Sequence, residues 1–282
     1  MKKYIPRVVR KPLGAIRTVA RRLKVWAKVA LRTRGATAED SKILWSAILH
    51  APLTVFRDLE QWQYPMVDHD CMIISNKIGL FKVRASTDDL KHILQGQEPS
   101  VEAAIRTLVK PGDTFVDAGA NIGFYTVLSS KLVGEKGRVV SFEMVPQTAT
   151  ILRCHVMQNG CSNVKVIEGA LAEISGLTVY ASLVDGKSGQ SSIRSGDSRS
   201  KVAVETITLH DQLKDIENVN LMKMDIEGAE LLALKGLSPD LQKVQAIIFE
   251  NRGAMDVVHY LQAHGFTISR LDGNNALARQ GV

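Results

Sequence analysis

From residue 110 onward, short apolar runs alternate with stretches in which apolar side chains recur every three or four positions. Runs such as Thr114–Val116 and Val244–Phe249 have the length of buried strands, and the intervening stretches have helical spacing. Alternation of this kind is typical of a parallel sheet with crossover helices. The same pattern predicts further strands at Arg138–Phe142, Val164–Ile167, Leu177–Ala181, Val202–Ile207 and Asn220–Met224, helices at Gln147–Gln158, through Leu231–Leu234 and at Met255–Ala263, and a closing antiparallel pair, Phe266–Leu271 with Ala276–Ala278.

Upstream of residue 110 the pattern predicts a hairpin between two helical regions. Met66–Arg84 alternates apolar and polar positions around Ser75-Asn76-Lys77, which is typical of a β-hairpin. Residues 41–64 form a predicted helical connector, and Asp88–Val109 has the spacing of a single helix. Further along the chain, Asp185–Ser200 is rich in Ser and Gly. We predict a mobile loop there, because such a segment cannot pack into a core.

The excess positive charge is confined to the N-terminal arm. The chain has 36 Lys and Arg against 29 Asp and Glu, which gives a net charge of +7. Twelve of the basic residues and none of the acidic ones lie within residues 1–34, so the other 24 basic and 29 acidic residues leave the rest of the chain at −5. We therefore predict a basic arm and connector over residues 1–60 and one domain over residues 61–282.

After Pro12 the arm has the spacing of an amphipathic helix with a basic face. Such helices lie on anionic membrane surfaces, and we predict this contact for the arm, on the inner face of the membrane. A plain structural arm, an organelle-targeting segment and a nucleic-acid contact are the alternatives. The apolar positions are Leu13, Ile16, Ala20, Leu23, Ala27, Ala30 and Leu31, and the basic positions are Arg17, Arg21, Lys24, Lys28 and Arg32.

The sequence predicts a cytoplasmic protein. No apolar run reaches the roughly 18 residues of a membrane-spanning helix. The nearest run, Ile43 to Phe56, is interrupted by His50 and Pro52. The three cysteines have no metal-ligand spacing, which is typical of reduced thiols in a cytosolic chain.

The most informative motif follows the first predicted core strand. Asp117, Gly119, Asn121 and Gly123 form a D-x-G-x-N-x-G pattern, in which the glycines let backbone N–H groups approach a ligand closely. The dinucleotide fingerprint would need glycine at 121 and 124, whereas the chain has Asn121 and Phe124. A carboxylate at 117 repels phosphate and attracts an ammonium or sulfonium cation. The pattern therefore predicts an S-adenosylmethionine site, with a purely structural turn as the alternative.

Acidic or small residues also end the neighbouring strands, where ligands of open α/β sheets bind. Glu143 lies one strand–helix–strand unit after Asp117, and we predict that it accepts hydrogen bonds from the ribose hydroxyls of the cofactor. A structural acid ahead of Pro146 is the alternative. Gly169 and Ala170 follow the third strand, where small residues would let an adenine ring lie against the backbone.

A second motif surrounds the predicted strand Asn220–Met224. Lys223 and Asp225 point to the same face, and Asp225 at the strand end opens onto the same crevice as Asp117. Glu227 and Glu230 follow in the turn and the first helical turn, where acidic side chains also favour the helix dipole.

Together these motifs resemble the FkbM-type family of S-adenosylmethionine-dependent methyltransferases, over about residues 95–255. The family has the class I methyltransferase fold, and the resemblance implies an α/β, Rossmann-like, doubly wound and mostly parallel seven-stranded sheet. It also implies methyl transfer mostly to hydroxyl oxygens of sugars, lipids or small molecules. His210-Asp211 stands where such proteins often have two acids. The residues that carry the resemblance are Lys110–Thr114, Asp117–Tyr125, Phe142-Glu143 with Pro146, Val204–Leu209 and Lys223–Glu230.

The resemblance assigns Asp117, Gly119, Asn121 and Gly123 to the methionine end of the cofactor, and Glu143 to its ribose. Asp225 then faces the reacting centre, and we predict that it is the general base for a hydroxyl on a sugar, glycolipid or small molecule. A Mg²⁺ ion held by Asp225 with Glu250-Asn251 is a second hypothesis for this site. Methylation of RNA and cofactor binding without catalysis are the alternative functions. Substrate choice is expected in Asp185–Ser200 and the N-terminal connector.

Overall fold

The computed structural model describes residues 7–55, 64–184, 187–192, 200–238, 240–251, 253 and 255–281. The chain divides into two compact units, Met1–Gln97 and Glu98–Val282. The sequence pattern predicts that the boundary between the arm with its connector and the domain lies after residue 60. In the structure the hairpin strands that follow residue 60 pair with a strand of the arm, so they belong to the N-terminal unit.

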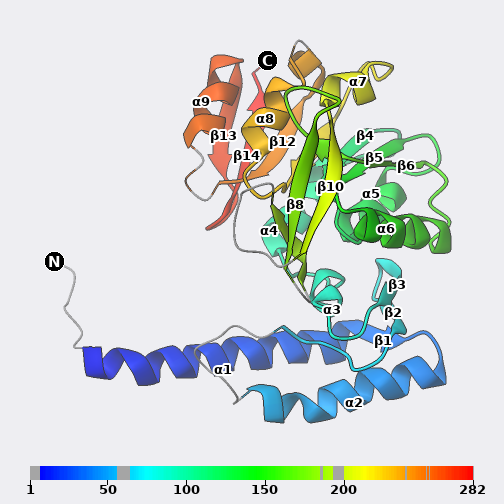
Figure 1. Ribbon diagram of the computed structural model, residues 1–282, viewed down its shortest axis with the longest axis vertical. Coiled ribbons are helices and arrows are strands. Elements are labelled where there is room, and N and C mark those ends of the chain that lie inside the picture. The colour runs from blue at the N-terminus through cyan, green and yellow to red at the C-terminus, as the bar shows by residue number, and fades with distance from the viewer. Residues whose placement is uncertain are drawn as a thin grey trace. The chain divides into compact units, whose positions relative to one another are not determined.

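The C-terminal unit is built on a seven-stranded sheet with the order β13-β14-β12-β11-β4-β5-β6 (Figure 1). Neighbours from β12 through β6 are parallel, and β14 is antiparallel to both of its neighbours. The predicted doubly wound class I fold with a closing antiparallel pair is therefore confirmed. The strands are β4 (Thr114–Ala118), β5 (Arg138–Glu143), β6 (Val164–Glu168), β11 (Leu221–Met224), β12 (Ala246–Glu250), β13 (Phe266–Arg270) and β14 (Asn275–Gln280).

Alternate residues of these strands lie in two different environments, one on each face of the sheet. Val116 and Met222 belong to an apolar core with residues of α7, α8 and α9. Asp117 and Lys223, one position further along, point to the opposite face because side chains alternate along a strand. Asp117 there contacts Thr126 of α5. The helices of this unit are α4 (Pro99–Leu108), α5 (Phe124–Val133), α6 (Pro146–Gln158), α7 (Leu209–Leu213), α8 (Glu230–Lys235) and α9 (Met255–Ala263), with a 3₁₀ turn at Asp240–Lys243.

The strand order fixes where a ligand can bind. From β4 the chain proceeds through β5 and β6 on one side of the sheet and returns through β11 and β12 on the other. The carboxyl ends of β4 and β11 therefore meet at the topological switch point, the usual ligand crevice of open α/β sheets. Asp117 and Lys223 lie directly opposite each other at this point.

A second sheet corrects the prediction of a mobile loop at Asp185–Ser200. Residues Lys187–Ser192 form strand β9, which pairs antiparallel with β8, and β10 begins at Ser200. A strand without apolar residues can form at a sheet edge, since the backbone ladder supplies its hydrogen bonds. Residues 185–186 and 193–199 lie outside the described part. The sheet has the order β7-β10-β8-β9, with β7 (Ala170–Leu171), β8 (Thr178–Val184) and β10 (Ser200–Ile207).

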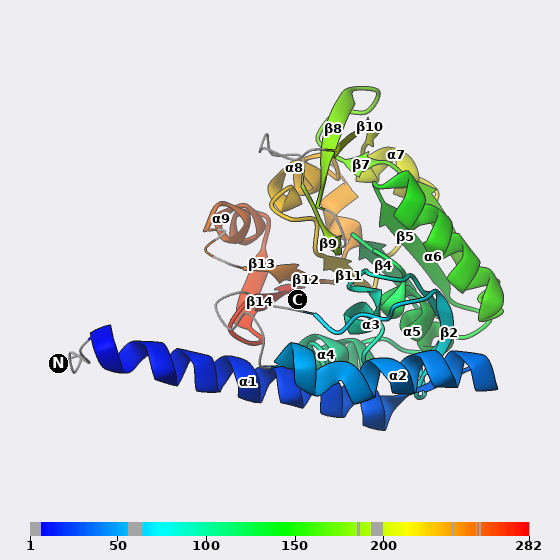
Figure 2. The ribbon, with the colours of Figure 1, turned by 60° about the horizontal axis from the view of Figure 1, so that its bottom comes forward.

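The N-terminal unit combines two long helices with a three-stranded sheet. The predicted hairpin is confirmed, and the arm forms a helix that begins before Pro12. Helices α1 and α2 lie side by side (Figure 2). Within the described residues no helix is long and apolar enough to span a membrane. The elements are α1 (Arg7–Arg32), β1 (Thr33–Gly35), α2 (Ala38–Val55), β2 (Cys71–Ser75), β3 (Gly79–Val83) and α3 (Asp89–His92).

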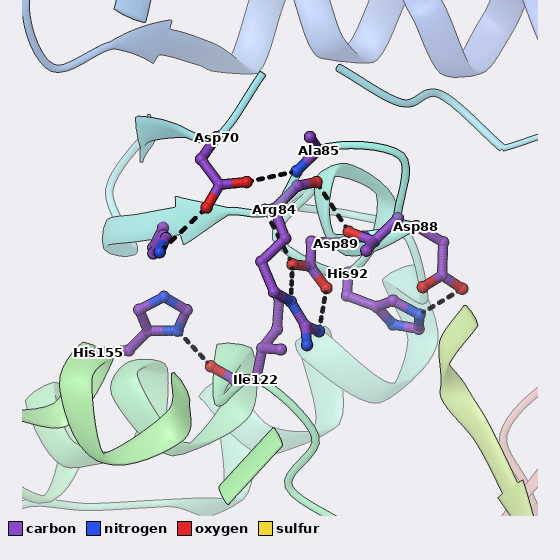
Figure 3. Close-up of polar contacts among 10 residues, drawn as sticks. Asp70, Arg84, Ala85, Asp88, Asp89, His92, Ile122 and His155 are labelled. Carbon is purple, nitrogen blue, oxygen red and sulfur yellow. Dashed lines mark hydrogen bonds and ion pairs between the residues drawn. The ribbon is translucent and has the colours of Figure 1, made fainter. Parts of the chain in front are cut away.

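The helix predicted at Asp88–Val109 is wrong as a single element. It is interrupted after His92 and resumes at Pro99 as α4. Gly96 adopts a left-handed backbone (φ +70°), and Pro99 suits only a first helical turn, so the chain breaks between the two. The short α3 is held by Asp89, which is buried and accepts two hydrogen bonds of 2.8 Å from the Arg84 guanidinium (Figure 3).

Candidate active site

The turn after β4 has a backbone that requires glycine. Gly119, Asn121 and Gly123 have φ angles of +79°, +51° and +94°. A Cβ on Gly119 would lie 2.0 Å from the backbone oxygen of Asp225, so this turn packs directly against the end of β11. The turn is also fixed from the other side, because buried His155 of α6 hydrogen-bonds the Ile122 carbonyl at 2.6 Å (Figure 3).

Asp117 is fully buried at the end of β4, and one of its two carboxylate oxygens has no hydrogen-bond partner. Its Oδ2 accepts a 2.7 Å hydrogen bond from the Thr126 hydroxyl, which also lies 2.9 Å from Ser141 Oγ. Its Oδ1 is buried without a hydrogen-bond partner and lies 4.0 Å from Lys223 Nζ. Burial raises the pKa of this carboxyl above its ordinary value, although Lys223 opposes the shift. A ligand that donates a proton or carries positive charge would satisfy Oδ1.

Lys223 connects the two carboxylates of the crevice. Its buried Nζ lies 3.5 Å from Asp225 Oδ2 and 4.0 Å from Asp117 Oδ1, and it stands 5.2 Å from the centre of the Tyr125 ring. Burial by itself lowers the pKa of the ammonium, but Asp225 and Asp117 outweigh burial and raise the pKa above its ordinary value. Lys223 is therefore a permanent cation at neutral pH, which excludes it as a general base.

Asp225 differs from Asp117 in its access to solvent. Its backbone N–H donates to the Ala118 carbonyl at 3.0 Å, so it sits beside the glycine turn. Its side chain is 39% exposed, whereas that of Asp117 is buried. Of the two carboxylates next to Lys223, Asp225 is thus the more accessible to solvent.

Glu143 ends β5 and ties the glycine turn to this strand. Its two carboxylate oxygens accept hydrogen bonds of 2.9 Å from the backbone N–H groups of Asn121 and Val145. Burial raises the pKa of Glu143 to about 7, against the effect of these two donors. The Asn121 Oδ1 next to it is buried and has no hydrogen-bond partner.

The remaining predicted site residues lie further along the same edge. Gly169 donates its N–H to the Glu143 carbonyl at 3.2 Å, and a Cβ there would lie 2.9 Å from the side chain of Ile207. Ala170 is buried with Ala181 in the core of the small sheet. The roles assigned to Gly169 and Ala170 beside an adenine ring stay predictions.

Two further features of the site concern acids and metals. Glu230 accepts backbone hydrogen bonds of 3.2 Å from Ile226 and Gly228, so it shapes the turn that follows Asp225. Glu230 therefore has the structural role expected of an acidic residue in the first turn of a helix. In the described part of the chain, no group of three or more His, Cys, Asp or Glu side chains is arranged to hold a metal ion.

Tyr125, Thr126 and Ser141 also belong to this site, although the sequence pattern assigned no role to any of them. Tyr125 is partly buried and donates its hydroxyl to Glu98 Oε2 at 3.1 Å, while Thr126 and Ser141 support Asp117. Ser141 is a polar residue inside an apolar strand, and this exception to the pattern is the signal that could have identified it.

Residues 117–271 match the family model described as the methyltransferase FkbM domain, which is more than half of the chain. The chain belongs to the FkbM methyltransferase family. The glycine turn, Glu143 and Asp225 all lie within the matched region. S-adenosylmethionine is the cofactor of this family.

Known proteins resemble the chain over parts of their length. Methyltransferase sdnD of Sordaria araneosa is 28% identical over 57% of this chain and 76% of the relative. The 31-O-demethyl-FK506 methyltransferase FkbM of Streptomyces tacrolimicus is 25% identical over 57% of this chain and 75% of the relative. The "probable cobalt-precorrin-6B C(15)-methyltransferase" of Sulfolobus acidocaldarius is 32% identical over 30% of this chain, which spans about half (48%) of that relative. The crystal structure of methyltransferase FkbM from Methylobacillus flagellatus has 16% identity and a TM-score of 0.44, covering 93% of this chain and 59% of that one.

The geometry of the FkbM domain fits S-adenosylmethionine. The unpartnered oxygens of Asp117 and Asn121 are acceptors suited to an ammonium donor. The positive φ angles of Gly119 and Gly123 fix the backbone path of the turn beside them. Glu143 supplies carboxylate oxygens that can also accept hydroxyl donors. The assignment of each residue to one part of the cofactor remains a prediction.

We expect the affinity for S-adenosylmethionine to fall as the pH drops through 7. In its predicted role beside the ribose, Glu143 must be ionised to accept from both hydroxyls, and burial raises its pKa to about 7. The carboxylate is thus mostly charged at pH 8 and mostly neutral at pH 6, which makes binding about tenfold weaker at the lower pH. Titration calorimetry at the two pH values measures this. The Glu143→Gln variant should bind weakly with a flatter pH dependence, and an equal pH dependence in both proteins would exclude Glu143 as the titrating group.

Proposed function

We propose that the protein transfers a methyl group from S-adenosylmethionine to a hydroxyl oxygen on a sugar, a glycolipid or another small molecule. The observation that carries this proposal is the half-exposed carboxylate of Asp225, which lies beside the glycine turn and 3.5 Å from a buried cation. A hydroxyl is a poor nucleophile until its proton leaves, so an O-methyltransferase needs an acceptor for that proton. We assign this role to Asp225.

The residues of the site have different roles in the proposed reaction. When bound, S-adenosylmethionine supplies an electrophilic methyl group on a positively charged sulfur. Asp225 would accept the proton of the acceptor hydroxyl as the oxygen–carbon bond forms and the carbon–sulfur bond breaks, which would leave a neutral thioether. Lys223 holds Asp225 in place, since its ammonium contacts the carboxylate. The raised pKa of Lys223 keeps this ammonium charged at neutral pH. Alignment of the two reactants by the rigid glycine turn supplies much of the rate acceleration.

The relatives also support a small hydroxylated acceptor. The Streptomyces tacrolimicus relative carries the name 31-O-demethyl-FK506 methyltransferase, which names an O-demethylated small molecule. The charge distribution argues the same way, since the chain after residue 34 has 24 basic and 29 acidic residues. A mildly acidic body would repel the phosphates of a nucleic acid.

Methyl transfer into fractionated cell extract tests the proposal. The purified protein is incubated with methyl-labelled S-adenosylmethionine and separate small-molecule, lipid, RNA and protein fractions. We expect label in the small-molecule or lipid fraction, as a methyl ether that resists mild alkali. Label confined to RNA would favour the nucleic-acid alternative. Absence of label from every fraction, in a protein that binds the cofactor, would favour a binding protein without catalysis.

A further inference from the structure

The apolar stripe of helix α1 faces solvent. Ile16, Ala20, Leu23, Ala27 and Leu31 recur every three or four residues and are all exposed, Leu31 to 77%. The opposite side of the helix carries the buried Val29 and Arg22. An amphipathic helix in water normally does the reverse and buries its apolar stripe. The orientation of α1 therefore leaves an apolar surface without a partner inside the described part of the N-terminal unit.

Contacts within the N-terminal unit hold α1 in this orientation. Lys28 Nζ donates to the Gly96 carbonyl, and the Arg32 guanidinium donates to the Gln95 carbonyl at 2.6 Å. Directly after the helix, β1 pairs with β2. These contacts fix the rotation of the helix about its own axis, so the exposed stripe is a property of the folded unit.

Basic side chains border the stripe. Arg17, Arg21 and Lys24 are exposed and follow the stripe along one edge at helical spacing. Nine of the 26 residues of α1 are Lys or Arg, and residues 1–34 contain no acid. Charge at this density excludes a helix that crosses a bilayer, and it also disfavours pairing with a second copy of the same surface. An apolar stripe edged with basic residues fits a partner that offers both acyl chains and phosphates.

Helix α2 adds a second exposed apolar row in the same unit. Trp45, Leu49 and Leu53 are spaced by four residues and are exposed, Leu49 to 73%. This helix packs alongside α1 (Figure 2). Tryptophan is enriched where proteins meet the membrane–water interface, because its ring is apolar and its N–H is polar.

We propose that the α1 stripe is a docking surface for an anionic lipid bilayer, with α1 lying in the plane of the membrane. Ile16, Leu23 and Leu31 enter the boundary between headgroups and acyl chains, and Arg17, Arg21 and Lys24 contact lipid phosphates. A nucleic acid would use the basic edge and leave the apolar stripe in water. The docked protein carries out its chemistry on molecules at or near that surface.

Vesicle flotation of the full-length protein tests this surface. We expect binding to vesicles of phosphatidylcholine with about one third phosphatidylglycerol, and much weaker binding to phosphatidylcholine alone. The triple variant Ile16→Gln, Leu23→Gln, Leu31→Gln keeps the charge and should bind the anionic vesicles about a hundredfold more weakly. The matched control is Met157→Gln, Ile174→Gln, Leu177→Gln, which removes equally exposed apolar side chains from the C-terminal unit and should bind like the wild type.

A second variant separates charge from apolar contact. Arg17→Gln, Arg21→Gln, Lys24→Gln should weaken binding to anionic vesicles about a hundredfold at low salt and should not alter binding to neutral vesicles. Unchanged affinity for S-adenosylmethionine and an unchanged circular dichroism spectrum show that the variants are folded. Wild-type protein that does not float, or an apolar triple variant that floats as well as the wild type, would overturn the proposal. Salt-sensitive binding of RNA, without any binding to vesicles, would also overturn the proposal.

Discussion

Replacing Asp225 with Asn should lower the turnover number about a hundredfold or more and leave the affinity for S-adenosylmethionine nearly unchanged. The amide has the size of the carboxylate but cannot accept the hydroxyl proton, and general-base catalysis is typically worth about 10²–10⁴ in rate. The side chain is exposed on the crevice beside the glycine turn and does not anchor it, since the contact with the turn is made by the backbone of Asp225. Label transfer into the acceptor fraction measures turnover, and calorimetry measures affinity.

The matched control for this variant is Asp256→Asn. Asp256 is an exposed aspartate at the start of α9, and its replacement should leave both turnover and affinity at wild-type values. Turnover of Asp225→Asn within threefold of the wild type would remove Asp225 as the base. Equal losses of turnover and cofactor affinity would instead show that Asp225 holds the cofactor.

Replacing Lys223 with Met should reduce the free energy of unfolding by about 3–5 kcal/mol. Asp117 is fully buried, and Lys223 Nζ lies 4.0 Å from its unpartnered oxygen. Removing one member of a buried ion pair leaves an uncompensated charge in the interior, which is the source of this large cost. Urea denaturation followed by circular dichroism gives the free energy of unfolding for both proteins.

Two further variants make this measurement specific. Lys235→Met removes a lysine from an exposed pair with Glu173, 3.9 Å apart, and should cost less than about 1 kcal/mol. The double variant Asp117→Asn, Lys223→Met should be more stable than Lys223→Met alone, because no buried charge is left without its partner. A cost for Lys223→Met as small as that for Lys235→Met would show that the buried pair has no structural role.

The cofactor side of the site follows from local sequence, whereas the pairing across the crevice does not. Asp117 and Glu143 could be predicted because each stands directly after an apolar run, where a strand must end. The contact between Asp117 and Lys223 depends on β4 and β11 being neighbours in the sheet, although they are more than a hundred residues apart. The spacing of apolar residues within either strand gives no information about which strands are neighbours in the sheet. The contact comes from the strand order, on which the predicted shared crevice of Asp117 and Asp225 also depends.

The N-terminal unit shows a different limit of pattern reasoning. The spacing of Leu23, Ala27 and Leu31 predicts an amphipathic helix, and the structure has one. The same spacing does not indicate whether the stripe faces a core or the solvent, because a helix has the same period in both orientations. The contacts of Lys28 and Arg32 with the chain before α4 decide this, and they join residues more than 60 positions apart. The polar strand β9 was missed for a related reason, because its pairing is made by the backbone.

The most direct test of the account is calorimetric titration of the purified protein with S-adenosylmethionine, with NAD and ATP as controls. The account predicts saturable binding of S-adenosylmethionine at one site. It predicts no binding of NAD or ATP, because Asn121 and Phe124 replace the glycines of the dinucleotide fingerprint and buried Asp117 repels phosphate. A folded protein that binds NAD or ATP in preference, or that gives no heat with S-adenosylmethionine, would contradict it.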